Sequence, residues 1–324
     1  MKGKILVTGA AGYIGAIATE LLISKGFEAV ALDDLSTGHK ESLFENIPFY
    51  EGKVGDKCLL EKIFSEHKID CVLHIAAAAL VEESTKNPSK YFDINFSQPN
   101  IMLETMIDFG VNKIVFSSTC AVYGIPNDDQ IPIKESNPKK PINPYGESKL
   151  VFEELLNWYK TNKGLDFIAL RFFNVAGASM NRGEKHSPET HLIPLVLKSI
   201  KKKDYNFKIY GNDYPTKDGT TIRDYIHVLD LNHALINSIE ALLDQKKHAN
   251  FYNLGYGQGY SVLEIVNAVK NVLGVEIPYT VTNRRPGDPA VLIADCKKVK
   301  EDLGWTPQYN NIEEIILSAN RFTN

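Results

Sequence analysis

The sequence has little cysteine, and its four cysteines stand far apart. None of Cys58, Cys71, Cys120 and Cys296 belongs to a CxxC pair. Cysteine ligands of structural zinc come at close, regular spacings, and disulfide frameworks are typical of short secreted chains. We therefore expect reduced thiols, no disulfide and no metal site.

Long apolar runs and an excess of positive charge are also missing. The longest apolar stretch, residues 71–81, contains His74 and is too short to span a bilayer, and the residues before Gly9 are too few for the apolar part of a signal peptide. The formal net charge of −4 argues against a general nucleic-acid binder, whose phosphate contacts need a basic surface. We therefore predict a soluble, cytoplasmic protein with no nucleic-acid or membrane partner.

Short β-branched segments alternate with longer segments of helical period in the first half of the chain. We expect strands at residues 5–8, 28–32, 71–75, 113–118 and 167–173. We expect helices between several of them, at residues 14–24, 59–67, 91–109 and 148–162. The apolar runs of the strands are continuous, which is typical of strands covered by helices on both faces. The pattern predicts an α/β protein with a Rossmann-type, doubly wound parallel sheet.

The regular alternation of predicted strands and helices ends at about Gly177. Polar segments with proline and glycine then separate shorter elements, at residues 178–189, 211–221 and 283–289. We expect a dinucleotide-binding domain at residues 1–176 and a smaller C-terminal substrate lobe at residues 177–324, with segment 222–245 returning to the first domain. Ligands of open parallel sheets bind at the carboxyl ends of the strands, where the two parts would meet.

A glycine-rich turn follows the first predicted strand. Gly9 allows a tight turn, Gly12 lets a pyrophosphate approach bare backbone, and Gly15 lets the next helix pack close to the strand. The N-terminus of that helix offers unpaired N–H groups to phosphates. Asp33 ends the second strand 18 residues after Gly15, where a carboxylate binds ribose hydroxyls and repels a 2′-phosphate. The alternative is an ordinary strand–helix turn; the combination favours NAD over NADP.

A phenol and an ammonium group stand four residues apart in YGESK (145–149), at the start of a predicted helix. At this spacing the two side chains share one face of the helix. A tyrosine with a pKa of about 10 is a poor base at neutral pH, so we expect Lys149, with oxidised nicotinamide, to lower the pKa of Tyr145. The phenolate would take a proton from a substrate hydroxyl while the attached carbon gives a hydride to NAD. Thr119 is placed to share the same substrate oxygen. Taken alone, YxxxK would usually be an ordinary helix start.

With these motifs, nearly the whole chain resembles the extended short-chain dehydrogenases/reductases, and within them the sugar-nucleotide 4-epimerases. The matching segments are TGAAGYIG (8–15), LDDLSTG (32–38), FSSTCAVYG (116–124), NPYGESK (143–149), LRFFNVAGA (170–178), ETHLIPLVLK (189–198), IYGNDYPTKDGTTIRDYIHVLDL (209–231), FYNLG (251–255) and RRPGDPAVLIAD (284–295). The last four are the most specific, because generic requirements of the fold do not explain them.

The resemblance implies an NAD-dependent isomerase that inverts C4 of a UDP-hexose through a transient 4-keto intermediate. UDP-glucose and UDP-galactose are the expected substrates, and UDP-GlcNAc and UDP-GalNAc stay open. On this basis residues 1–176 would bind NAD and residues 177–324 the UDP-sugar. The resemblance also implies a homodimer formed through the helices at residues 91–109 and 148–162.

The resemblance assigns roles to particular residues. The catalytic roles fall on Tyr145, Lys149 and Thr119. The cofactor contacts fall on Gly9, Gly12, Tyr13, Ile14, Gly15, Asp33, Asp56, Ala76, Asn95 and Lys149. The substrate contacts fall on Thr119, Tyr145, Asn174, His191, Leu192, Arg223, Arg285, Asp288 and Leu292. The two arginines suit a diphosphate, because a guanidinium fork makes paired, charged hydrogen bonds with it.

At three positions this sequence has another residue than some members of the family. Ala79 stands where some members have a lysine near the nicotinamide ribose, and His191 stands where others have an asparagine that faces the substrate phosphates. We expect His191 to be a neutral loop histidine. Leu292 falls where a tyrosine restricts other members to unacetylated sugars, so it is either a wider gate to the sugar pocket or an ordinary apolar residue of a short strand at residues 291–294.

Other functions of the same fold stay open as alternatives: UDP-xylose 4-epimerase, decarboxylase and dehydratase. A dehydratase places an acidic pair directly after the threonine, whereas Cys120 and Ala121 follow Thr119 here. A dehydrogenase with net oxidation would release its cofactor at each turnover. A binding module without catalysis would not need Thr119, Tyr145 and Lys149 together, because the fold alone does not demand them.

Overall fold

A seven-stranded parallel sheet forms the centre of the computed structural model, which describes residues 2–201, 206–285 and 287–323. From one edge to the other its strands are β10 (Phe251–Leu254), β6 (Asp166–Phe172), β5 (Lys113–Thr119), β4 (Cys71–His74), β1 (Lys4–Thr8), β2 (Glu28–Asp33) and β3 (Phe49–Glu51). The predicted α/β fold class is confirmed, and each of the five predicted strands ends within one residue of its expected bounds.

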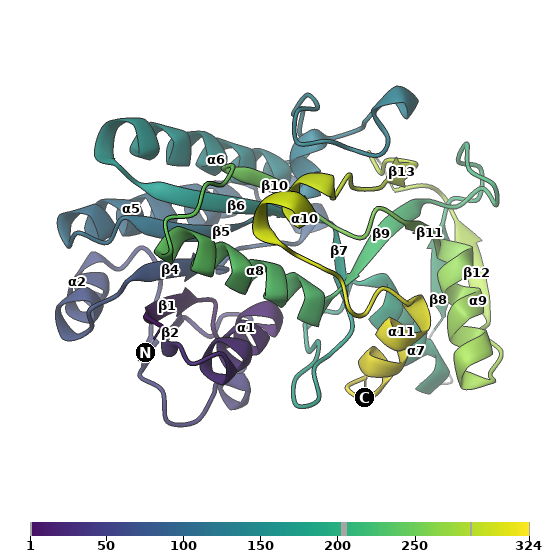
Figure 1. Ribbon diagram of the computed structural model, residues 1–324. Coiled ribbons are helices and arrows are strands. Elements are labelled where there is room, and N and C mark those ends of the chain that lie inside the picture. The colour runs from purple at the N-terminus through teal and green to yellow at the C-terminus, as the bar shows by residue number, and fades with distance from the viewer. Residues whose placement is uncertain (1, 202–205, 286, 324) are drawn as a thin grey trace.

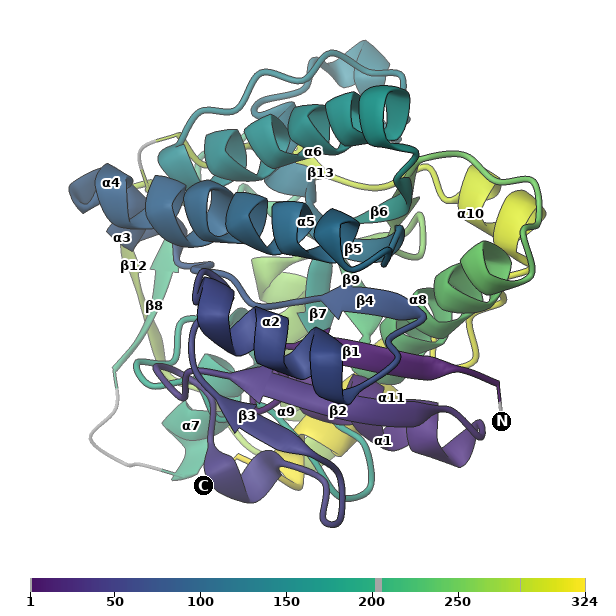
Figure 2. The same cartoon turned by 90° about the vertical axis from the view of Figure 1, so that its left-hand side faces the viewer.

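Helices cover both faces of this sheet (Figure 2). One face carries α2 (Lys57–Glu66), α5 (Gln98–Asp108) and α6 (Pro144–Lys163); the other carries α1 (Tyr13–Ser24) and α8 (Val228–Leu243). Alternate residues of β1 point to opposite layers, since Ile5 and Val7 pack with Leu22 and Leu235 whereas Leu6 packs on the other side. Burial on both faces explains why the strand sequences lack polar alternation.

The predicted helix at residues 91–109 is divided into three parts. It consists of α4 (Pro88–Phe92), a π-helical turn at Asp93–Ser97 and α5. Pro99 lies at the start of α5 and has no N–H group, so it cannot donate to the residue four positions earlier. The wider turn before it re-aims the side chains of residues 93–97, including Asn95.

The second half of the chain builds a separate lobe at one end of the sheet (Figure 1). Strand β9 (Ile222–His227) pairs with β7 (Asn174–Ala176), β11 (Gly259–Ser261) and β13 (Val291–Leu292), and β8 (Phe207–Tyr210) pairs with β12 (Tyr279–Thr282). The helices α7 (Leu192–Lys201), α9 (Val262–Leu273) and α11 (Ile312–Asn320) share a third apolar core with β7, β8 and β9. The remaining elements are α3 (Val81–Lys86), α10 (Lys297–Leu303) and 3₁₀ turns at Lys40–Ser42, Cys120–Tyr123 and Asp128–Gln130.

The chain returns to the first sheet after β9. Helix α8 packs against α1 and against β4, β5 and β6, and β10 then forms the outer strand beside β6. The sequence pattern did not indicate β10 as a strand of this sheet. None of the helices in the described part of the chain is long and apolar enough to cross a membrane.

Candidate active site at the carboxyl ends of the strands

The turn after β1 has room only for glycine at two positions. Gly9 has a φ of +72°, and a Cβ added to it would lie 2.7 Å from the backbone nitrogen of Ala76. A Cβ added to Gly15 would lie 2.0 Å from the carbonyl oxygen of Gly9. Gly12 is the N-cap of α1 and provides no side-chain cap, so backbone N–H groups are left to face the sheet edge. This is the geometry that an anion such as a pyrophosphate requires.

Asp33 is joined directly to this turn. It is the last residue of β2, and its carboxylate accepts 2.8 Å hydrogen bonds from the backbone N–H groups of Ala11 and Leu35. Burial raises the pKa of Asp33, while the two backbone hydrogen bonds counteract this effect. The carboxylate is thereby fixed beside the glycine turn, as a ribose-binding group would have to be.

Other predicted cofactor contacts surround the same edge. The Tyr13 hydroxyl donates a 2.5 Å hydrogen bond to the Gly177 carbonyl and so connects α1 to the segment after β7. Ala76 follows β4 and donates to the Thr8 carbonyl at 3.2 Å. Asp56 caps α2, and Ile14 packs against the main core, which is the apolar core between the sheet and helices α1 and α8. The backbone of Ala76 lies next to Gly9, where a Cβ would collide with it. The structure therefore brings these residues to the ends of neighbouring strands.

Asn95 is buried in the π-helical turn, and both the oxygen and the nitrogen of its side-chain amide form hydrogen bonds. Its Oδ1 accepts from the Ala78 backbone N–H at 2.9 Å, and its Nδ2 donates to the Ala78 carbonyl and to Ser148 Oγ, both at 3.0 Å. Asn95 thus connects the segment after β4 to α6, one residue before Lys149. The sequence did not single out Ser148, which completes this connection.

Thr119 and Tyr145 meet where β5 ends and α6 begins. Asn143 caps α6, because its side chain accepts from the Gly146 N–H at 2.9 Å. A Cβ at Gly146 would lie 2.7 Å from the Ala121 carbonyl oxygen, so glycine permits the close approach of α6 to the turn after β5. The start of α6, which carries Tyr145, therefore lies against the turn that follows Thr119.

Lys149 lies behind this pair and is only 2% exposed. Its Nζ donates a 2.8 Å hydrogen bond to the Ser117 carbonyl and lies 4.6 Å from the centre of the Phe116 ring. Burial lowers the pKa of Lys149 to about 7, and Glu153 counteracts part of this shift. Burial also raises the pKa of Tyr145 to about 12, against the effect of the Thr119 hydrogen bond. Desolvation therefore disfavours both charged forms in the protein alone, and the expected lowering of the Tyr145 pKa, which includes the charge of oxidised nicotinamide, stays a prediction.

A buried network that the sequence did not reveal supports the same strand. Arg171 on β6 is 1% exposed and makes a two-pronged ion pair with Glu153 on α6, at 2.9 and 2.6 Å. Ser118 donates to the same carboxylate at 2.6 Å. The edge of the Tyr91 ring also packs against Tyr145, with ring centres 6.4 Å apart. The only sequence signal was the position of Glu153, one helical turn after Lys149.

On the second lobe, Arg223 is linked to two other predicted substrate contacts, Asp288 and Leu292. It lies on β9, forms an ion pair with Asp288 at 2.5 Å, and donates to the carbonyl oxygen of Pro289 at 2.8 Å. Leu292 pairs with Arg223 in the strand register and is buried in the main core. The charge of Arg223 also counteracts part of the rise in the pKa of Cys120, the residue after Thr119.

The remaining predicted substrate contacts come from separate elements. Asn174 begins β7 and pairs with Tyr225 of β9, and Leu192 begins α7. Arg285 is exposed and its guanidinium lies 4.1 Å from the centre of the Tyr210 ring. Pro286 of the RRPGDP motif is outside the described residues.

His191 has an acidic environment. Its Nδ1 lies 2.8 Å from a carboxylate oxygen of Glu189 and 3.8 Å from one of Glu184. Burial lowers the pKa of His191, but the two carboxylates outweigh this effect and raise it above the ordinary value. The expectation of an ordinary neutral histidine is thus wrong in direction, because the sequence did not show that both glutamates would face the ring.

Comparisons with known proteins agree with this geometry. The NAD dependent epimerase/dehydratase family matches residues 5–255. The UDP-glucose 4-epimerase of Lacticaseibacillus casei is 47% identical over 97% of this chain and 95% of its own. The structure of UDP-glucose 4-epimerase from Brucella ovis in complex with NAD has a TM-score of 0.94 at 38% identity and 98% coverage of both chains. The UDP-Glc/GlcNAc 4-epimerase from Campylobacter jejuni has a TM-score of 0.84 at 38% identity, again over 98% of both chains. The resemblance predicted from the motifs is confirmed, and the chain belongs to the NAD-dependent epimerase/dehydratase family.

Proposed function

We propose that this chain is an isomerase that inverts C4 of a UDP-hexose, interconverting UDP-glucose and UDP-galactose through a transient 4-keto sugar. The observation that carries the proposal is that α6, with Tyr145 and Lys149, packs on the end of β5: Lys149 is hydrogen-bonded to Ser117, and Gly146 lies against Ala121, two residues after Thr119. The glycine turn lies at the carboxyl end of β1 in the same parallel sheet. Its relatives over nearly the full length of the chain are UDP-glucose 4-epimerases, and the function predicted from the sequence agrees with them.

NAD fits the first half of the site. The turn at Gly9 and Gly15 has no space for side chains, Gly12 leaves the α1 N-terminus bare, and the Asp33 carboxylate is held next to them. An adenosine ribose with free hydroxyls suits Asp33, whereas a 2′-phosphate would be repelled. When bound, NAD supplies a hydride acceptor for C4 of the sugar and a positive charge beside Tyr145.

Tyr145 is proposed as the base for the 4-hydroxyl proton. Thr119 is proposed to hold the same sugar oxygen, since the start of α6 with Tyr145 packs against the turn that follows Thr119. Lys149 is anchored on Ser117 and is well placed to stabilise a phenolate at the start of α6. Asn95 positions this end of α6 through Ser148. These four side chains therefore control the proton at O4.

The second lobe is proposed to hold the UDP group while the sugar turns. Arg223 and Arg285 supply the positive charge for the diphosphate, and Asp288 is suited to ribose hydroxyls. Asn174, His191 and Leu192 complete the proposed contacts. A keto sugar that stays tethered by its diphosphate can present its other face before it is reduced, so the configuration at C4 inverts without net oxidation.

The dehydratase alternative lacks its acid and base. A dehydratase must also remove the C5 proton and expel the C6 hydroxyl, but Cys120 and Ala121 follow Thr119. Burial raises the pKa of the Cys120 thiol to about 12, so it stays protonated at neutral pH. Neither residue can replace a carboxyl pair.

We also propose a cytoplasmic homodimer that uses the helices at residues 91–109 and 148–162. Trp158 on α6 is 67% exposed, which suits a helix that packs against a second copy. Light scattering of the purified protein should give twice the chain mass, and Trp158→Glu should shift it towards the monomer.

The decisive test of the reaction is a panel of UDP-sugars incubated without added NAD. The purified chain should convert UDP-galactose to UDP-glucose and the reverse. The absorbance of NADH should show no net change, because the reaction has no net oxidation. Tyr145→Phe serves as the control for contaminating activity. Release of carbon dioxide from UDP-glucuronate, or loss of water from the hexose, would instead establish a decarboxylase or dehydratase.

A further inference from the structure

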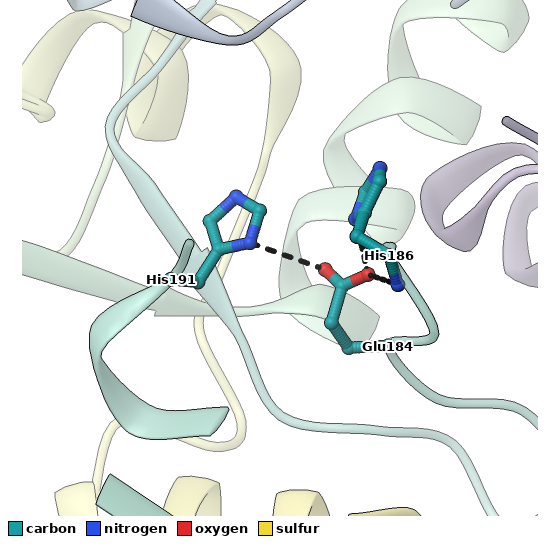
Figure 3. A group of neighbouring side chains, drawn as sticks. All are labelled: Glu184, His186 and His191. Carbon is teal, nitrogen blue, oxygen red and sulfur yellow. Dashed lines mark hydrogen bonds and ion pairs between the residues drawn. The ribbon is translucent and has the colours of Figure 1, made fainter. Parts of the chain in front are cut away.

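A cluster of metal-ligand side chains lies on the segment between β7 and α7. Glu184, His186 and His191 each direct one ligand atom into the cluster, and these atoms lie within 4.8 Å of one another. Figure 3 shows the Glu184 carboxylate between the two imidazoles. The ring centres of His186 and His191 are 5.4 Å apart.

Two histidines and a carboxylate are a common donor set for zinc and related divalent ions. Ligand atoms that each lie about 2.1 Å from one ion are at most about 4 Å apart. Small rotations of these partly exposed side chains are sufficient to reach that spacing. Glu189, whose carboxylate lies 2.8 Å from His191 Nδ1, adds a second negative charge beside the three.

The carboxylate of Glu184 is the common partner of both histidines. His186 Nδ1 forms an ion pair with one of its oxygens, and His191 Nδ1 lies 3.8 Å from the other. The Glu184 side chain is only 11% exposed, so its charge is held largely out of water between the two rings. A metal ion bound by all three groups would take the place of these direct contacts.

The cluster adjoins two small surface hollows. Glu184 and His186 line one of them together with Gly12 and Tyr13. Glu184 and His191 line the other, which also contains Tyr13. The three donors can therefore be reached from solvent.

We propose that Glu184, His186 and His191 bind one divalent transition-metal ion, with zinc as the best fit. The ion neutralises the adjoining glutamates and fixes the segment between β7 and α7 against the start of α1. The expectation of no metal site rested on cysteine spacing and did not address histidine and glutamate donors. His191 is also one of the proposed substrate contacts, so the test changes His186 and Glu184, and zinc binding is measured without UDP-sugar or NAD.

The test is a zinc titration of chelator-treated protein in competition with a chromophoric chelator. The parent for all measurements carries Cys58→Ser, because Cys58 is an exposed thiol that can itself bind zinc. We expect one zinc per chain at micromolar concentration and a higher melting temperature when zinc is present. Cobalt(II) should give the visible bands of a tetrahedral site.

His186→Gln and Glu184→Gln should each weaken zinc binding about tenfold or more and abolish the thermal shift. His248→Gln is the matched control, because His248 also pairs with a carboxylate, that of Asp166, but has no second histidine beside it. Circular dichroism without zinc verifies that each variant is folded. Equal zinc affinity of the parent and His186→Gln, or no stoichiometric binding by the folded parent, would overturn the proposal.

Discussion

The ammonium group of Lys149 donates a 2.8 Å hydrogen bond to the carbonyl oxygen of Ser117, two residues before Thr119 on the same strand. The contact fixes the lysine below the end of β5 rather than at the protein surface. It also leaves a cation almost fully out of water, with the Phe116 ring as a neighbour. Burial lowers the pKa of Lys149 to about 7 for this reason.

The lowered pKa predicts a pH-dependent stability. An unfolded lysine keeps its proton up to about 10.5, whereas folded Lys149 releases it above about 7. Between these values the unfolded state binds more protons, so stability rises with pH, and the contribution is lost as pH falls through 7. The free energy of unfolding of the wild type should therefore increase relative to Lys149→Met from about pH 7 to about pH 9.

Lys160→Met is the control for this comparison. Lys160 lies on the same helix, but its side chain is 42% exposed. Denaturant unfolding of the three proteins over the same pH range gives the measurement. A constant difference between wild type and Lys149→Met would show that the lysine titrates outside this range.

Removal of the Tyr145 hydroxyl should abolish most turnover. Tyr145→Phe should lose a factor of about 10²–10⁴ in kcat, the usual contribution of a general base, while the affinity for UDP stays nearly unchanged. Thr119→Val should also be slow, and Thr119→Ser should be mild because it retains the hydroxyl. Steady-state kinetics and UDP titration separate the two effects. Near-native turnover of the Phe variant would remove Tyr145 from the mechanism.

NAD should remain bound through purification and turnover. The cycle returns its own hydride, so activity should not require added cofactor, and NAD should be released only on denaturation. Gly12→Ala adds a Cβ whose nearest atom is 3.4 Å away, so the fold accommodates it, but the methyl group occupies the approach of the pyrophosphate. This variant should be folded and contain less NAD. Activity in proportion to added NAD, with accumulation of NADH, would favour a dehydrogenase.

The central sheet was predicted well from the sequence because each of its five predicted strands is marked by a continuous apolar run within the strand itself. Continuous β-branched runs such as residues 113–118 are required for a strand buried on both faces. The YxxxK spacing is also local, and the structure places the start of α6, which carries Tyr145, against the turn that follows Thr119. By contrast, β10 became recognisable only from its pairing with β6. The ion pair between Arg171 on β6 and Glu153 on α6 likewise joins two separate elements. Contacts between distant segments leave no periodic signal.

The pKa values were the other part that sequence could not predict. Spacing along a helix indicates that Lys149 and Tyr145 share a face, but not how much water reaches them. Both are desolvated, and this effect raises the pKa of Tyr145 and lowers that of Lys149. His191 shows the opposite case, since two glutamates outweigh its burial. Residue type and spacing therefore predicted the groups but not their charge states.

The buried ion pair behind the catalytic strand should be essential for stability. Glu153→Gln removes the negative charge that pairs with the buried Arg171 guanidinium. This should lower the free energy of unfolding by about 3–5 kcal/mol. Glu154→Gln, at the neighbouring exposed position of α6, should change it by less than about 0.5 kcal/mol. Denaturant unfolding of both variants tests this. Equal stability of the two would mean that the pair is dispensable.

The breadth of the sugar pocket is predicted to depend on Leu292. This residue is buried in the main core and pairs in register with Arg223, so it adjoins a proposed diphosphate contact. Leucine is smaller than tyrosine, and a wider pocket would accept an N-acetyl group at C2. We therefore expect the chain to epimerise UDP-GlcNAc alongside UDP-glucose, and we expect Leu292→Tyr to suppress only the acetylated substrate. The alternative is that Leu292 serves only the packing of a short strand.

A second variant distinguishes these two roles. Leu292→Met nearly conserves the volume, so it should keep both activities. Leu292→Tyr can also strain the core, so the melting temperatures of all three proteins must be compared with the kcat/KM values for both substrates. A selective loss of UDP-GlcNAc activity at preserved UDP-glucose activity supports the gate, because general strain would reduce both. If the wild type ignores UDP-GlcNAc, or if Leu292→Tyr loses both activities to the same extent, Leu292 is a packing residue and the preference is set elsewhere in the pocket.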